Sequence, residues 1–385
     1  MANFKEKIIK ITDYKVLGEL PDPFLRADGT RVASAKGFDE HKKELYKSVV
    51  ELQYGTMPPA PEFLKVELLN NSRKDWGRLL CYRIVSGRHD HPVSFTMRVY
   101  QPQAEGKTPV IVDRDLCWDY AFDESFRKVA LDAGIGLVLF NRTELAPDIK
   151  DAGRHSPLYD CYPDRTFGAL GAWAWGFSRC VDALEQLDLF DLDWIAFTGH
   201  SRGGKTAMLA GVLDQRARIV APNETNAGSC SCYRIHMKAI KENGKEFRSE
   251  TLADIHKNFP FWFGPELGEY AQREAELPFD AHFTKAMVAP RTLLVAEAAS
   301  NIWTNPIGSW MTTQAVKEVY QLYGKEENLF WYFRHGDHYH KPEDLRMLVS
   351  VIRHQRYGEP LDDGFFSPPF EEPELIYHWK CPEKE

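Results

Sequence analysis

The chain has 385 residues, of which 43% are hydrophobic, so it is long enough for two or three domains or for one α/β core with insertions. Its 48 Lys and Arg residues and 56 Asp and Glu residues give a formal charge of −8, without a basic block that could follow a phosphate backbone. The longest apolar run, 135–140, is far shorter than the roughly 20 residues that span a bilayer. Composition therefore argues against nucleic acid and a membrane as partners.

The start of the chain, MANFKEKIIKITDYKVLGELPDP, carries charges where a signal peptide would have an apolar stretch. We therefore expect a cytoplasmic protein. The seven cysteines are an odd number without the spacing of a disulfide framework. Cys230 and Cys232 form a single CxC pair, without the second pair that a zinc site requires. Reduced thiols are the expectation.

The predicted elements begin with an accessory N-terminal segment, in which a helix at 39–53 lies between two turn-rich loops. β-rich stretches follow at 79–85, 93–102, 108–115 and 135–143. The last two are continuous apolar runs, as strands buried on both faces require, and a helix at 123–133 separates them. This region predicts the beginning of a buried sheet.

Strands and helices alternate through the second half of the chain. A helix at 166–187 presents apolar residues three or four apart. It is followed by strands at 194–199, 219–224, 291–298 and 329–336 and by helices from Arg202, at 314–323 and at 342–356. The stretch 225–280 is irregular, and the proline-rich tail 359–385 is expected to run extended along the surface.

This alternation predicts an α/β fold with a doubly wound, mainly parallel sheet in a three-layer sandwich. The functional loops should then lie at the carboxyl ends of the strands. We assign 1–95 to an N-terminal extension that packs on the core and 96–358 to the core domain, with an insertion at about 225–280. The tail, 359–385, completes the chain.

One stretch after the strand at 194–199 fits two motifs. As G-x-S-x-G around Ser201 it is a nucleophile elbow, a tight strand-to-helix turn that needs small residues two before and two after the serine. As G-x4-G-K-T over 199–206 it is a P-loop, which would cradle the phosphates of a nucleotide. The first motif predicts a serine hydrolase and the second a nucleotide-binding protein.

The later sequence favours the elbow. A P-loop normally follows the first strand of its domain, whereas at least four predicted strands precede this motif. An elbow needs an acid and then a His later in the chain, and Glu224 ends the next strand while a His cluster follows the last one. Glu297, at the end of another strand, is the alternative acid, and the P-loop remains the remote alternative function.

The His cluster also admits a metal site, since imidazole and carboxylate ligands suit zinc. The cluster consists of His335, Asp337, His338 and His340. Metal sites usually draw ligands from several elements, and no second dense cluster stands upstream in the sequence. We therefore expect one catalytic His in a polar loop, with no metal and no cofactor.

Three blocks of the sequence resemble the glucuronoyl esterases, α/β hydrolases that cleave the ester between glucuronic acid on xylan and lignin alcohols. The blocks are 171–185 (GAWAWGFSRCVDALE), 198–207 (TGHSRGGKTA) and 222–234 (PNETNAGSCSCYR). The resemblance covers roughly 165–345 and implies a serine carbohydrate esterase that cleaves glucuronoyl (uronate alkyl) esters through an acyl-enzyme. An acetyl xylan esterase-like sugar deacetylase is the alternative within the same chemistry.

Carried over residue by residue, the resemblance implies that Ser201 is the nucleophile and Glu224 the acid. Arg202 matches the arginine that donates to the oxyanion from its backbone and side chain. Laying the family pattern Gly-x-His-x-His-Cys on the His cluster puts the general base at His340, with His338 as the runner-up.

The resemblance also implies substrate-binding residues. Lys205 matches a lysine that holds sugar hydroxyls, Trp303 lies close to the tryptophan that packs on the uronate, and Trp262 stands in a matching Phe-Trp-Phe stretch. The Gln and Glu that contact the uronate in the family fall near Thr251 and Phe259 here. The partner is therefore expected to be a small-molecule or oligosaccharide ester.

The chain departs from the family where secreted fungal members bridge two cysteines. Those members place one Cys just before the nucleophile and the other just after the catalytic His, and this chain has His200 and Lys341 there. Loss of the bridge agrees with a cytoplasmic protein. Imported oligosaccharides or small esters would then be the substrates.

Overall fold

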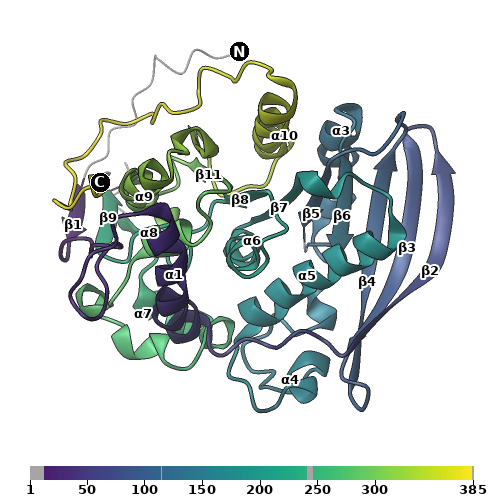
Figure 1. Ribbon diagram of the computed structural model, residues 1–385, viewed down its shortest axis with the longest axis horizontal. Helices are drawn as coiled ribbons and strands as arrows, with labels where there is room; N and C mark the ends of the chain where they lie inside the picture. The colour runs from purple at the N-terminus through teal and green to yellow at the C-terminus, as the bar shows by residue number, and fades with distance from the viewer. Residues whose placement is uncertain (1–12, 114, 241–245, 384–385) are drawn as a thin grey trace.

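The computed structural model describes residues 13–113, 115–240 and 246–383. A large central sheet organises the described chain (Figure 1). Its strands are β2 (Phe63–Lys74), β3 (Gly77–Gly87), β4 (Pro92–Pro102), β5 (Val110–Asp113), β6 (Gly136–Phe140), β7 (Ile195–His200), β8 (Ile219–Asn223), β11 (Thr292–Ala298) and β12 (Leu329–Arg334). Within these residues the sheet has nine strands in the order β12-β11-β8-β7-β5-β6-β4-β3-β2.

The sheet is parallel from β12 to β6 and antiparallel from β6 to β2. The doubly wound, mainly parallel sheet predicted from the sequence is therefore confirmed. The antiparallel part was only partly predicted, because the second part of β2, from Asn70, is polar and most side chains of the strand are exposed.

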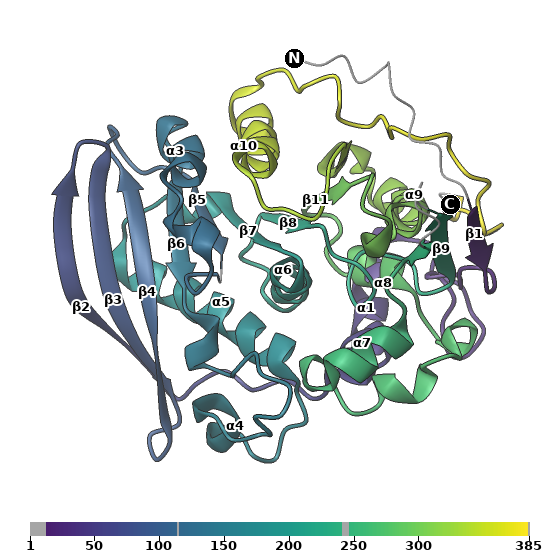
Figure 2. The same ribbon diagram turned by 180° about the vertical axis from the view of Figure 1, so that it is seen from behind.

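Helices cover both faces of the sheet (Figures 1 and 2). One face carries α3 (Glu124–Asp132) and α10 (Pro342–Tyr357), and the other carries α5 (Ala169–Leu187), α6 (Arg202–Leu213), α8 (Ala281–Ala286) and α9 (Pro306–Tyr323). The side chains of β5 alternate between these two faces. Val110 and Val112 belong to the apolar cluster that contains residues of α5 and α6. Ile111 belongs to the cluster that contains residues of α3 and α10. Alternation along a strand buried on both faces gives the three-layer sandwich.

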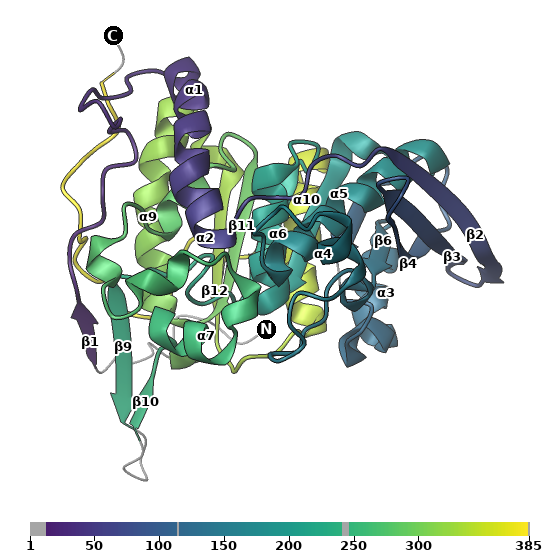
Figure 3. The same ribbon diagram turned by 90° about the horizontal axis from the view of Figure 1, so that it is seen from below.

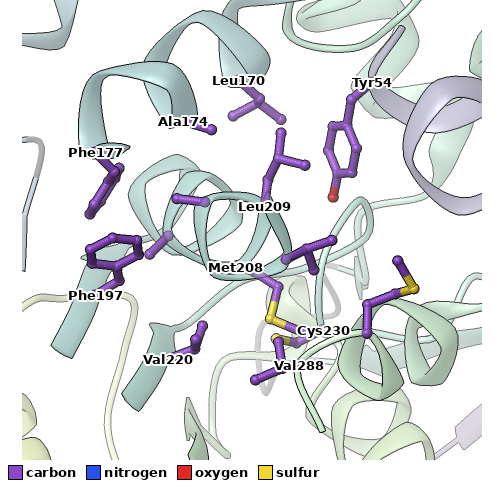
Figure 4. Close-up of a cluster of buried hydrophobic side chains, with 14 of the residues drawn as sticks. Tyr54, Leu170, Ala174, Phe177, Phe197, Met208, Leu209, Val220, Cys230 and Val288 are labelled. Atoms are coloured by element: carbon purple, nitrogen blue, oxygen red, sulfur yellow. The ribbon is translucent and has the colours of Figure 1, made fainter. Parts of the chain in front are cut away.

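Helix α6 packs between α5 and the sheet (Figure 4). Leu209 on α6 and Leu170 on α5 are fully buried, and Phe197 and Val220 contribute from β7 and β8. Close packing on both sides fixes the axis of α6, and therefore the position of the residues at its N-terminus.

The N-terminal segment forms a helix as predicted, with an earlier start. Helix α1 (Ala35–Leu45) begins after Ser34, whose side chain accepts a hydrogen bond from the Gly37 amide. It continues through a π-helical turn (Tyr46–Glu51) into α2 (Leu52–Tyr54). The expected boundary at residue 95 is wrong, because it falls inside β4 and because β2 and β3 belong to the central sheet.

The stretch 225–280 is not wholly irregular. It contains α7 (Leu252–Asn258), β9 (Ile235–Ile240) and β10 (Glu246–Arg248), and β9 also pairs with β1 (Asp13–Val16) (Figure 3). A further short helix, α4 (Pro157–Cys161), precedes α5. These elements are short and lie outside the large sheet. A search for helical or strand periodicity in the sequence therefore did not predict them.

The tail beyond residue 358 runs extended and lies against the N-terminal segment (Figure 1). The Leu20 amide donates to the Ile376 carbonyl at 2.9 Å, and the Trp379 indole donates to the Leu20 carbonyl at 2.8 Å. Tyr377 and Phe370 are buried. Among the described residues, no helix has the length and apolar character to cross a membrane.

Candidate active site

Ser201 occupies a strained turn at the centre of the parallel sheet. Strand β7 ends at His200 and α6 begins at Arg202, and the serine between them has φ 56° and ψ −120°. A positive φ is rare for a residue with a side chain and marks a backbone held by its surroundings. A Cβ atom on Gly199 would lie 2.6 Å from the Gly203 carbonyl carbon, so the turn requires glycine there. This is the geometry of a nucleophile elbow.

The same segment does not have the features expected of a P-loop. The Thr206 hydroxyl, which would bind magnesium there, donates to the Arg202 carbonyl within α6 at 2.8 Å. Lys205, which would reach the phosphates, is 1% exposed and is bonded to protein groups. The nucleotide-binding alternative is therefore unsupported by the geometry.

Glu224 lies beside the elbow, directly after β8, and is fully buried. Its Oε2 is 2.9 Å from His338 Nδ1, and its Oε1 accepts from the Arg334 guanidinium. Burial raises the pKa of Glu224, and the Arg334 charge opposes that rise. Because a guanidinium stays charged and contacts this carboxyl directly, we treat Glu224 as a carboxylate at neutral pH.

Glu297, the alternative acid, makes its hydrogen bond to a residue outside the triad. Its Oε1 accepts from the Ser309 hydroxyl at 2.9 Å. Burial raises the pKa of Glu297 as it raises that of Glu224, so the hydrogen-bond partners and not the pKa values separate the two acids. The geometry therefore supports Glu224 as the partner of the histidine.

The structure places His338, and not His340, on the acid. His340 is buried against the rings of Tyr120 and Phe126, at centroid distances of 4.6 and 4.7 Å. Among the described residues neither of its ring nitrogens has a hydrogen-bond partner. The expectation that His340 is the base is therefore corrected in favour of the runner-up. The family pattern contains two His, and spacing alone does not say which of the two side chains reaches Glu224.

His338 is suited to accept a proton. Burial lowers the pKa of His338 to about 4, with further lowering from Lys205 and Arg334, so its ring is neutral at pH 7. Its Nδ1 donates to Glu224, which leaves Nε2 unprotonated. A neutral imidazole with this tautomer is the state that a general base needs.

His200 lies between the other two imidazoles. Its ring centroid is 4.5 Å from that of His338 and 5.2 Å from that of His340, and its Nδ1 lies 2.8 Å from Asn223 Oδ1. Burial and the two neighbouring His rings hold the pKa of His200 well below its ordinary value.

The histidines around Glu224 also bear on the metal site that the sequence admitted. Ligand atoms of His200, Glu224 and His338 lie within 4.8 Å of one another, although the sequence pointed to a different set at 335–340. Both carboxylate oxygens of Glu224 are already engaged, one by the Arg334 guanidinium and one by His338. The nearby positive charge opposes a cation, so the residues fit a hydrogen-bonded triad better than a metal centre.

The guanidinium of Arg202 lies among aromatic rings and next to one carboxylate. Its Nη1 donates to Asp148 at 2.6 Å, and its Cζ lies 4.8 Å from the Trp262 ring centroid and 5.6 Å from that of Trp118. The backbone amide of Arg202 stands in the first turn of α6, where helix amides have no partner within the helix. The Arg202 amide therefore directly follows the nucleophile, while its guanidinium is held by Asp148 and the neighbouring rings.

Lys205 begins a polar relay, a chain of hydrogen bonds that runs through Asn226 to Glu250. Its Nζ donates to the Ala227 carbonyl at 2.5 Å and to the Asn226 side chain, and the Asn226 amide donates to Glu250. Burial lowers the pKa of Lys205 and raises that of Glu250, and the attraction between their charges opposes both shifts. The sequence reading missed Asn226 and Glu250, although Glu250 directly precedes Thr251, where a substrate contact was expected.

The two predicted tryptophans differ. Trp303 is 37% exposed, and its ring meets that of His338 edge to face at 5.1 Å, as a sugar platform beside the site requires. Trp262 is 3% exposed, stacks on Phe259 at 3.9 Å and donates its indole N–H to Asp148 at 3.0 Å. Trp262 is therefore a buried partner of Asp148 and of the Arg202 guanidinium, and its expected substrate contact stays a prediction.

Comparison with known proteins identifies the family. The family model described as "Glucuronyl esterase, fungi" matches residues 84–324. The chain belongs to the glucuronoyl esterase family. A 4-O-methyl-glucuronoyl methylesterase 1 of Wolfiporia cocos is 30% identical over 79% of this chain and 72% of its own length. A relative from Podospora anserina, also named 4-O-methyl-glucuronoyl methylesterase, is 29% identical over 84% of this chain and 64% of its own length, which is less than two thirds of that protein.

Solved structures agree with this family. A glucuronoyl esterase of carbohydrate esterase family 15 from Caldicellulosiruptor kristjansonii has a TM-score of 0.78 and 26% identity, covering 93% of this chain and 97% of that one. The catalytic domain of the Hypocrea jecorina glucuronoyl esterase has a TM-score of 0.76 and 24% identity, covering 96% and 98%. This glucuronoyl esterase therefore has the α/β-hydrolase fold and is a carboxylic-ester hydrolase.

The esterase differs from the bridged pattern at the elbow. His200 stands in the place of the bridged cysteine before the nucleophile, packed on His338. All seven cysteines are described, and none of them forms a disulfide bond. Packing between the His200 and His338 rings is therefore found where the bridged pattern has a disulfide bond.

Proposed function

We propose that this esterase hydrolyses alkyl esters of glucuronic acid through an acyl-enzyme formed on Ser201. The observation that carries the residue assignment is the 2.9 Å contact between His338 Nδ1 and Glu224 beside the strained serine. His338 is the proposed general base and Glu224 the acid that orients it.

The proton moves along this triad in two half-reactions. Neutral His338 accepts the Ser201 hydroxyl proton while the serine oxygen attacks the ester carbonyl, and the resulting imidazolium is stabilised by Glu224. The imidazolium then gives its proton to the leaving alcohol, and the C–O bond to that alcohol breaks. A water molecule repeats the sequence on the acyl-enzyme and releases the free uronate.

Arg202 is the proposed oxyanion donor. Its backbone amide directly follows the nucleophile, where negative charge develops in the tetrahedral intermediate, and the proposal assigns its guanidinium to the same charge. Loss of one donor of this kind costs roughly 2.7–4 kcal/mol of transition-state stabilisation.

The relay from Lys205 through Asn226 to Glu250 supports a sugar as the acyl part. Lys205 and Glu250 are nearly fully buried, so the proposal requires a sugar hydroxyl to replace one of their protein partners. Trp303 is 37% exposed, its carbonyl accepts from the Glu250 amide at 3.0 Å, and its ring offers an apolar surface for a sugar face. An acetyl group carries no hydroxyl for the relay, so uronate esters are favoured over the deacetylase alternative. A related esterase from Sporotrichum thermophile, 24% identical, was crystallised with methyl 4-O-methyl-β-D-glucopyranuronate, which is in line with this choice.

A substrate panel tests the proposal. Methyl and benzyl glucuronate, acetylated xylo-oligosaccharides and 4-nitrophenyl acetate are compared at equal enzyme concentration, with Ser201→Ala as the control. We expect the highest kcat/KM for a uronate ester and none of this activity in Ser201→Ala. Faster turnover of the acetylated sugars would favour the deacetylase, and full turnover by Ser201→Ala would reject the serine mechanism.

A cytoplasmic location remains part of the proposal. The seven cysteines, none of which forms a disulfide bond, support it, because disulfides are rare in reducing compartments. Fractionation of the native cells, followed by immunodetection, would test it, and recovery outside the cytoplasm would contradict it.

A further inference from the structure

We propose that Asp148 is a positioning residue of the esterase, which acts on the ester carbonyl through Arg202. The inference rests on the proposed role of Arg202 and adds a residue that the sequence gave no reason to select. Asp148 follows the loop after β6 and stands more than fifty positions before the arginine that it holds.

Asp148 is a junction of three hydrogen-bond donors. Its Oδ2 accepts from Arg202 at 2.6 Å and pairs with Arg142 Nη2 at 2.8 Å, and its Oδ1 accepts from the Trp262 indole at 3.0 Å. Only 10% of its side chain is exposed. A carboxylate that is both buried and fully engaged has one orientation, and so imposes one on its partners.

Arg142 makes the junction rigid. Its side chain is 2% exposed, its Nε lies 3.1 Å from Asp115 Oδ1, and its guanidinium lies over the Trp173 ring at 4.2 Å. Arg142 is therefore anchored independently of Arg202. The chain from Asp115 through Arg142 to Asp148 links the oxyanion arginine to the buried core beneath α5.

The geometry points to orientation as the task of Asp148. The guanidinium of Arg202 is 24% exposed and is flanked by the rings of Trp262, Phe259 and Trp118, which restrict its plane but not its rotation within that plane. Asp148 engages Nη1 and so fixes the rotation, leaving the other N–H groups to face the ester. Since the carboxylate also reduces the positive charge at the site, its contribution has to come from geometry.

The carboxylate stays ionised over the working range. Burial raises the pKa of Asp148, but Arg142, Arg202 and the Trp262 hydrogen bond together hold it below its ordinary value. The junction is therefore present whenever the enzyme is folded.

A double-mutant cycle tests the proposal on full-length esterase with benzyl glucuronate. Asp148→Asn retains the shape of the side chain and loses its charge. We expect kcat to fall about 10–100-fold with little change in KM, because a misplaced donor weakens transition-state binding. In an Arg202→Ala background the same substitution should change kcat by less than about twofold, since the residue it positions is gone.

A matched control separates this effect from a general loss of packing. Asp214 is also a buried aspartate on an arginine, with 6% exposure and a 2.7 Å contact to Arg216, but it lies at the other end of α6. Asp214→Asn should leave kcat unchanged. Asp148→Glu, which keeps the charge, should recover part of the loss, and if Asp148→Asn does not fold, Trp262→Phe removes one donor from the same carboxylate.

The proposal is overturned if Asp148→Asn lowers kcat equally with and without Arg202, or lowers only the melting temperature. Failure of the proposed function has a different signature, because wild-type enzyme would then not turn over the uronate ester while Ser201-dependent turnover of another ester remained. The cycle can be run on that ester, so the two outcomes are distinguishable.

Discussion

His338 Nδ1 lies 2.9 Å from the Glu224 carboxylate, although 114 positions separate the two residues in the chain. Parallel strands β8 and β12 bring them to the same edge of the sheet, on either side of β11. The contact decides which of two neighbouring histidines can act as the base, and the first prediction follows from it.

Replacing the two histidines separates their roles. His338→Ala should lower kcat about 10²–10⁴-fold, because the serine loses its proton acceptor. His340→Phe should keep kcat within about threefold, since the ring lies in an aromatic cage and its nitrogens have no hydrogen-bond partner among the described residues. Steady-state kinetics on benzyl glucuronate measures both, and the reverse ranking would restore His340 as the base.

The two candidate acids differ in the same way. Glu224→Gln should lower kcat by about 10²–10⁴-fold, because the imidazolium loses its counter-charge and His338 loses its acceptor. Glu297→Gln is the isosteric control, since Glu297 is bonded to Ser309. Kinetics at saturating substrate measures the effect, and a larger loss in Glu297→Gln would move the acid to β11.

Arg334 should set the acid limit of activity. Its charge lowers the pKa of both Glu224 and His338, so Arg334→Gln removes a cation and raises both. The active state has Glu224 ionised and His338 neutral, and both are lost as pH falls through these pKa values. We therefore expect the acid limb of the kcat/KM profile to move upward by about one pH unit or more.

Circular dichroism should accompany that measurement, because Arg334 also contacts Asp344 at 2.6 Å and its loss leaves two buried carboxyls facing each other. A folded variant with an unchanged acid limb would show that other groups set it.

The polar relay should decide selectivity for the acyl group. Lys205→Met and Glu250→Gln each remove a charge from the relay with little change in volume. The ratio of kcat/KM on methyl glucuronate to that on 4-nitrophenyl acetate should fall about 10–100-fold, in line with the loss of a hydrogen bond from a charged group. A constant ratio would mean that the relay does not touch the sugar.

The packing of α6 predicts a stability effect. Leu209 is fully buried between α5 and the sheet, so Leu209→Ala should lower the free energy of unfolding by about 2–5 kcal/mol in urea denaturation. Leu68→Ala on the edge strand is the control, because that side chain is 54% exposed and should change stability by less than about 0.5 kcal/mol. Similar losses at both positions would contradict the packing described for α6.

The sequence predicted the parts of the molecule whose pattern is local. Strands β5 to β8 are short apolar runs and α5 has a clear helical period, so the fold class followed from them. Ser201 and Glu224 followed because each stands at the end of such a strand. Strand β2 escaped because its side chains are mostly exposed and its stretch around 70–72 is polar.

The site was harder to predict where contacts are made by neighbours in space. His338 and His340 are equivalent in any one-dimensional pattern, and only the conformation of the loop directs His338 to Glu224. Trp262 was selected from a Phe-Trp-Phe stretch that matches the family, and that match did not indicate that the side chain is buried. Asp148 lies in an ordinary loop and carries no motif, so nothing in the sequence links it to Arg202.

The hydrogen bond between Trp379 and Leu20 joins positions 359 residues apart, so it closes nearly the whole described chain into a non-covalent ring. Closing a long loop is costly in entropy, but the cost rises only slowly with length, and the buried Tyr377 and Phe370 offset it. The N-terminal segment around Leu20 and the C-terminal segment around Trp379 should therefore lose their hydrogen bonds together. Removing the last twenty residues would then expose amide protons in 17–32 to exchange, while the elbow at the centre of the sheet stays protected.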